Sequence, residues 1–198
     1  MVSGELVIMI ESMKKPGVEF EHDPGLFAFL QFQCSLKDDP GYDFEVQSCE
    51  QEFLEAVCCD ESEKIIVRKN SRRSGGTTLF CAMALYYHLI GYRVALTTLN
   101  YNMLALLAGV IDNIDVYGYT PMHSKVDASV YLRSVLYENQ RAPINIQMIV
   151  VGDRYDTAFK GKSFDYVFMD NVTSRDQNKA YQGAITNTTK KIVINVTA

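Results

Sequence analysis

Residues 64–79 of this chain read Lys64-Ile65-Ile66-Val67-Arg68-Lys69-Asn70-Ser71-Arg72-Arg73-Ser74-Gly75-Gly76-Thr77-Thr78-Leu79. The order is an apolar strand, a short basic loop with glycines, and the start of a helix. A phosphate-binding loop, G-x-x-x-x-G-K-[ST], has the same order, and its backbone N–H groups, lysine and hydroxyl hold phosphates and Mg²⁺. Gly75 and Thr77 occupy the second glycine and hydroxyl positions, but Asn70 replaces the first glycine. Gly76 replaces the lysine, so the pattern predicts that the loop keeps its geometry but lacks the main positive charge that would contact the phosphates.

The missing lysine leaves a gap that Lys69, Arg72 or Arg73 would have to fill. We predict that the loop and the first helical turn bind the phosphates. The residues in this prediction are Ser71, Arg73, Ser74, Gly75, Gly76, Thr77 and Thr78, with Arg72 neutralising charge. The alternative is a basic strand-to-helix turn that binds no ligand.

The composition of the chain indicates a globular protein with one sizeable core. It has 198 residues, of which 47% are hydrophobic and 22% charged. A net charge of −5 argues against a surface that coats nucleic acid, so any DNA contact needs a local basic patch. The five cysteines have no C-x-x-C spacing and no secretory leader precedes them, which predicts reduced thiols in a cytosol. No apolar run reaches the roughly 18 residues that cross a membrane.

Helical and strand patterns alternate along most of the chain. We predict helices over 45–57, 77–90, 100–110 and 125–138, and strands over 5–10, 65–67, 93–97, 144–151, 166–169 and 191–196. This alternation predicts an α/β fold with a mostly parallel central sheet flanked by helices. Residues 45–198 are the expected core, and residues 1–44 an N-terminal extension that packs on it.

A second motif is the strand Phe164-Asp165-Tyr166-Val167-Phe168-Met169-Asp170-Asn171. In enzymes with a phosphate-binding loop, an aspartate at the end of such a strand organises Mg²⁺, and the next carboxylate polarises the attacking water. Asp170 fits the metal role, whereas Asn171 can orient a water but cannot accept its proton. We expect the strands ending near Lys69 and Asp170 to be neighbours, so that Thr77 and Asp170 share one Mg²⁺ site. The alternative for Asp170 is capping of the following turn.

The segments together resemble the ATPase domain of large terminase subunits, the DNA-packaging motors of tailed phages and herpesviruses. The family pattern S-R-x-x-G-K-[ST]-T matches residues 71–78 except at Gly76, and its R-G-x-S-F-D segment matches Lys160-Gly161-Lys162-Ser163-Phe164-Asp165. Its D-E strand end matches Asp170-Asn171, and its threonine-rich coupling strand matches Ile192-Val193-Ile194-Asn195-Val196-Thr197-Ala198. The resemblance covers residues 45–198.

The resemblance implies a P-loop NTPase of the RecA and terminase type that uses ATP and Mg²⁺. It implies metal ligands at Thr77 and Asp170 and catalytic roles for Arg72, Asn171 and Thr197, the last as relay of the nucleotide state. The implied partners are viral DNA, the portal or other packaging subunits and further copies of the chain, with no membrane. The implied location is the host cytoplasm or the virion.

Two departures from the family pattern concern turnover. Gly76 removes a charge from the phosphates, and Asn171 removes the water-polarising carboxylate, which predicts weak or lost ATP hydrolysis. The alternative is a non-hydrolysing structural or interaction subunit with the same fold. The nuclease domain of a packaging subunit is not expected here, and we expect an open sheet edge near residues 192–198 that pairs with a partner.

Overall fold

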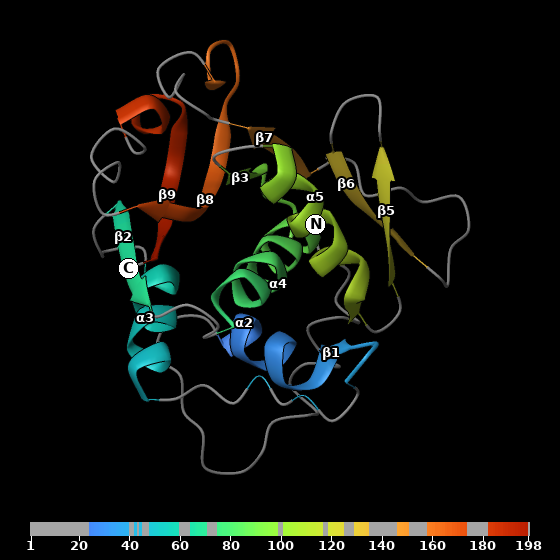
Figure 1. The fold of residues 1–198 in the computed structure, drawn as a ribbon. Coiled ribbons are helices and arrows are strands. Elements are labelled where there is room, and N and C mark those ends of the chain that lie inside the picture. The colour runs from blue at the N-terminus through green and yellow to red at the C-terminus, as the bar shows by residue number, and fades with distance from the viewer. Residues whose placement is uncertain are drawn as a thin grey trace.

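The computed structural model describes residues 24–39, 42, 44, 48–59, 64–70, 75–98, 101–116, 119–124, 129–134, 146–150, 158–173 and 182–197. The strands described there form one sheet in the order β1-β4-β5-β6-β7-β3-β8-β9-β2. Figure 1 shows this sheet with α4 and α5 packed in front of it. The predicted strand over 5–10 lies outside the described residues.

One half of the sheet is parallel, as predicted. It contains β7 (Ile146–Val150), β3 (Val94–Thr98), β8 (Phe164–Thr173), β9 (Thr188–Thr197) and β2 (Ile65–Asn70). Helices cover parallel strands on their faces, so these strands are runs of apolar residues rather than alternating ones. All five residues of β3 are buried, which is typical of that arrangement.

The other half is antiparallel, and the sequence analysis did not predict it. It contains β1 (Cys34–Leu36), β4 (Ile114–Val116), β5 (Tyr119–Ser124) and β6 (Ser129–Ser134). The helix predicted over 125–138 is wrong across 129–134, which form β6. Val130 and Leu132 are two residues apart and so fit one face of a strand, and antiparallel pairing with β5 stabilises that choice.

The helical segments described up to residue 113 lie on one face of the sheet, around α4. They are α2 (Pro24–Ala28), the π-helical turn η1 (Phe29–Gln33), α3 (Ser48–Cys58), α4 (Gly76–Leu89) and α5 (Tyr101–Asn113). Helices were predicted at the last three positions. In α4 every residue from Leu79 to His88 is buried, so this helix is the centre of one face of the molecule. A helix that is apolar on all sides needs cover on all sides, and α2, α3 and α5 contribute to that cover.

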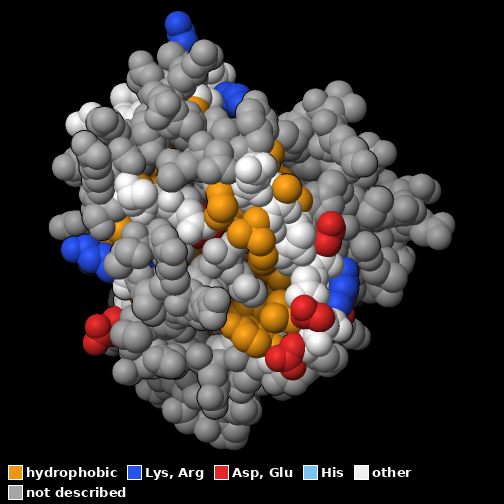
Figure 2. Space-filling view, in the orientation of Figure 1, with side chains coloured by type: hydrophobic (Ala, Val, Ile, Leu, Met, Phe, Trp, Pro, Cys, Tyr) orange, Lys and Arg blue, Asp and Glu red, His pale blue; other side chains and the backbone are white. Residues whose placement is uncertain are grey.

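Two hydrophobic clusters lie on opposite faces of the sheet. The larger joins α4 to residues such as Leu96, Phe168 and Val193, and it includes Leu26 and Phe44 from the N-terminal part. The boundary at residue 44 stays a prediction. Figure 2 shows an apolar stripe over the helices of this face. Leu106 of α5 is 50% exposed. In the described part of the chain, no helix is long and apolar enough to cross a membrane.

Candidate nucleotide-binding site

The loop after β2 leads into the N-terminus of α4. Gly75 precedes this helix with φ of 72°, a left-handed conformation that glycine adopts without strain. Gly75 has no side chain that could cap the helix, and the first N–H groups of a helix have no intrahelical partner. Such a helix start binds anions. The predicted site residues Ser71, Arg72, Arg73 and Ser74 lie outside the described residues.

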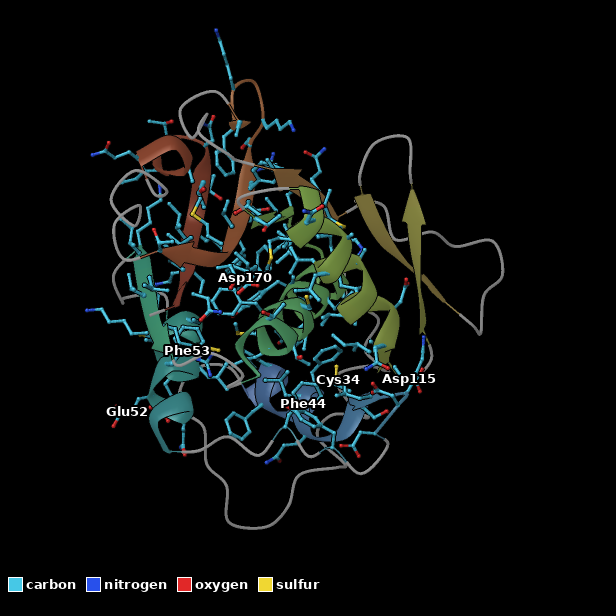
Figure 3. The ribbon with its side chains drawn as sticks, in the orientation of Figure 1. Cys34, Phe44, Glu52, Phe53, Asp115 and Asp170 are labelled. Atoms are coloured by element: carbon cyan, nitrogen blue, oxygen red, sulfur yellow. The ribbon has the colours of Figure 1, made fainter. Side chains whose placement is uncertain are left out.

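The structure brings Thr77 and Asp170 together. The Thr77 hydroxyl donates a hydrogen bond of 2.8 Å to Asp170 Oδ2, although the two residues are 93 positions apart. Figure 3 shows Asp170 beside the N-terminal end of α4. The expectation that β2 and β8 are neighbours is wrong, because β9 lies between them. The contact forms nonetheless because α4 packs against β8 and β3, which brings Thr77 to the end of β8.

Asp170 is the centre of a buried hydrogen-bond cluster. It is 1% exposed, and besides Thr77 it accepts bonds from Asn171 Nδ2 (3.0 Å) and Asn195 Nδ2 (2.7 Å). Sequence reasoning missed Asn195 as a site residue. The available signal was an amide side chain inside the otherwise apolar strand Ile192-Val193-Ile194-Asn195-Val196. Three donors from three elements fix the position of the carboxylate.

Asn171 has the conformation of an irregular strand residue. Its φ is 55°, and the register between β8 and β9 shifts between Met169 and Val172. Asparagine tolerates this left-handed region better than most residues. The shift lets β8 continue to Thr173, beyond the end predicted near residue 169. The catalytic role of Asn171 stays a prediction.

Thr197 lies between the two strands that end at the site. Its backbone pairs with Asn70 of β2 on one side and with Thr173 of β8 on the other. The strand β9 is therefore paired on both sides, and the open edge expected near residues 192–198 is wrong. Among the described strands, β2 ends the sheet on this side. The relay role of Thr197 stays a prediction.

The oxygen atoms at the site suit Mg²⁺. Mg²⁺ prefers hard oxygen ligands and commonly takes one or two from protein, with water and phosphates as the others. The Thr77 hydroxyl and the Asp170 carboxylate form such a pair. Within the described ranges no group of three or more His, Cys, Asp or Glu side chains could hold a metal. Burial and then the charge of Asp170 raise the pKa of Cys81, one turn after Thr77, so its thiol is not a competing ligand.

The fold is α/β, and the parallel half of its sheet brings the helix after β2 to an acidic strand end. It is similar to the crystal structure of the HK97 bacteriophage large terminase, with a TM-score of 0.59 and 11% identity over 87% of this chain and 37% of that one. This chain thus spans just over a third of that protein. The Thermus phage P74-26 large terminase ATPase domain gives a TM-score of 0.47 and 11% identity over 76% of this chain and 69% of that one.

A large terminase from a thermophilic bacteriophage, in complex with ADP, gives a TM-score of 0.48 and 12% identity over 74% of this chain and 38% of that one. No family model and no curated protein matches the sequence. The similarity is therefore one of fold.

Proposed function

We propose that this chain is a terminase-like nucleotide-binding domain that binds ATP with Mg²⁺ and hydrolyses it weakly or not at all. The observation that supports this most is the 2.8 Å bond between Thr77 and Asp170. It unites the helix after the phosphate-binding loop with the end of the acidic strand. A fold similar to the HK97 large terminase supports the packaging-motor class.

In this proposal each described residue of the candidate site has its own role in nucleotide binding. The N–H groups of the first turn of α4 bind phosphate oxygens, and Gly75 provides the turn that lets the backbone approach them. Thr77 and Asp170 hold the metal, while Asn171 and Asn195 keep the Asp170 carboxylate in place. Bound Mg²⁺ would neutralise charge on the phosphates. In this proposal Arg72 adds the positive charge that Gly76 lacks.

Weak hydrolysis follows from the absence of a carboxylate at residue 171. The amide of Asn171 cannot accept the proton of an attacking water. Asp165 does not replace it, because it lies at the other end of β8 and accepts bonds from the Arg93 backbone (2.9 Å) and Thr189 Oγ1 (2.7 Å). Burial raises the pKa of Asp165, but these donors outweigh it and hold the pKa below its usual value.

A second candidate function is a non-hydrolysing structural or interaction subunit. The replacement of both the loop lysine and the catalytic carboxylate favours it. In either case we propose viral DNA, the portal, other packaging subunits or further copies of the chain as partners, in the host cytoplasm or the virion.

Binding of a fluorescent ATP analogue by the purified chain, with Mg²⁺ and with EDTA, tests the proposal. We expect Mg²⁺ to strengthen binding, and Asp170→Asn to abolish that gain because it removes a charged metal ligand. Asp165→Asn is the matched control, since it makes the same change at the opposite end of the same strand, and it should keep the gain. No binding by the wild-type chain would instead support the structural role.

A further inference from the structure

A row of four buried polar residues crosses the sheet next to the site. Arg68 of β2 pairs in register with Asn195 of β9. Asp170 follows Met169, which pairs with both Ile194 and Thr97, so Asn195, Asp170 and Thr98 line up on three adjacent strands. The row contains Arg68, Asn195, Asp170 and Thr98, which are 6%, 3%, 1% and 2% exposed.

This row lies on the sheet face that α4 covers. Leu96, Phe168 and Val193 stand two residues before Thr98, Asp170 and Asn195, and all three belong to the cluster that contains α4. Residues two apart in a strand share a face. Strands buried on both faces are normally apolar throughout, so the row needs an explanation.

Two oxygen atoms in the row have no hydrogen-bond partner among the residues that the structure describes. They are Asn195 Oδ1 and Thr98 Oγ1, on the strands that flank Asp170 on its two sides. The Asn195 amide nitrogen is already bonded to Asp170 Oδ1, which fixes the orientation of the amide and leaves its oxygen as an available acceptor. Buried polar atoms without a partner are rare in native proteins, and they indicate a bound water or ion.

We propose that Asn195 and Thr98 are positioning residues that accept hydrogen bonds from the water molecules of a Mg²⁺ ion held by Asp170. This inference rests on the proposed function. Mg²⁺ gives up its water ligands reluctantly and usually keeps several of them. Each such water has two O–H donors, and the unpaired oxygens on either side of Asp170 are acceptors for them. Neither an amide nor a hydroxyl removes a proton from water at neutral pH, so the role is orientation.

Thr98→Val tests the inference with two independent measurements. Valine keeps the shape of threonine and removes only the unpaired hydroxyl. Without ligand, the variant should unfold at a urea concentration no lower than the wild type, because no hydrogen bond is lost. With ADP present, the metal concentration at half-saturation should rise about tenfold or more, as for other residues that orient metal ligands. Mn²⁺ followed by electron paramagnetic resonance is the probe, and nucleotide binding in EDTA should not change.

Thr97→Val is the matched control, since it makes the same change in the same strand on the opposite face. It should leave the metal concentration at half-saturation, the metal midpoint, at the wild-type value. Asn195→Leu should raise the midpoint as well, and if it does not fold, Thr98→Val decides. A wild-type midpoint in Thr98→Val, or a lower stability without ligand, would overturn the inference. A wild-type chain that binds no nucleotide would contradict the proposed function itself.

Discussion

Gly75 shows how one residue can set the geometry of the loop. Its φ of 72° is strained for any residue with a Cβ, and an added Cβ would lie 3.1 Å from the Tyr42 hydroxyl. We expect Gly75→Ala to lower the free energy of unfolding by about 1–2 kcal/mol. Urea unfolding measures it.

Gly109→Ala is the control for this prediction. Gly109 is exposed inside α5, and an added Cβ would meet no atom within 4 Å. Because alanine favours a helix, this change should stabilise the protein by about 0.5–1 kcal/mol. Equal effects of the two variants would contradict the role assigned to Gly75.

The residues of the site were only partly predictable from the sequence. Thr77 and Asp170 follow from motif spacing, because the chemistry of phosphate and Mg²⁺ binding requires those residue types after a strand. Asn195 lies in the strand matched to the coupling motif, but the motif assigns it no role, since that role depends on β9 lying between β2 and β8. The left-handed conformation of Asn171 depends on a register shift between strands that the sequence does not show.

At the scale of elements, the parallel strands and the long helices were predictable and the antiparallel strands were not. The apolar runs of β3, β8 and β9 predict strands, and the pattern of α4 predicts a helix, from the sequence of each segment alone. Strand β5 includes Pro121, and β6 has a spacing of apolar residues that also fits a helix. Their strand conformation depends on the pairing of β6 with β5 and with β7, which the pattern inside each segment does not show.

The C-terminal turn of α4 contains a buried histidine that should make stability depend on pH. His88 is 3% exposed, and in the described part of the chain its two ring nitrogens have no hydrogen-bond partner. Burial lowers its pKa from 6.5 to about 4. Above pH 6.5 the ring is neutral in both states and contributes no pH dependence. Below it the unfolded chain binds a proton that the folded chain does not, so stability falls as the pH drops towards 4.

We expect this histidine to lower the free energy of unfolding by about 2 kcal/mol between pH 7 and pH 5. His88→Leu should remove that part of the pH dependence. Urea unfolding of both proteins at pH 7, 6 and 5 measures the difference. Asp165 does not interfere, because its lowered pKa places its contribution below pH 3.8. Parallel pH curves for the two proteins would contradict the prediction.

At the scale of the whole molecule, the site exists only when the parallel half of the sheet is assembled. Thr77, Asp170 and Asn195 come from α4, β8 and β9, and their contacts span 93 and 25 positions of sequence. Neither the loop nor the acidic strand has the site by itself. The candidate site therefore requires the assembled sheet, and we do not expect the repair of one residue to give full ATP hydrolysis.

The final prediction concerns ATP hydrolysis by the whole domain. We expect weak or absent turnover in the wild type, and a gain when Gly76→Lys and Asn171→Glu are combined, because each restores an electrostatic contact. One such contact is commonly worth about 10²–10³-fold in rate. The gain should be smaller than two full contacts, because glutamate at a φ of 55° is strained where asparagine is tolerated.

Phosphate release with Mg²⁺, measured for both single variants and the double variant, tests this expectation. Adding Asp170→Asn to the double variant is the control, and it should remove the gain if turnover uses the Asp170 metal site. Rapid hydrolysis by the wild-type chain would contradict the prediction, because another group would then have to replace the missing carboxylate. A double variant that binds Mg²⁺ and ATP without any gain in the rate of hydrolysis would favour the structural subunit, because such a subunit needs to bind nucleotide but does not need to hydrolyse it.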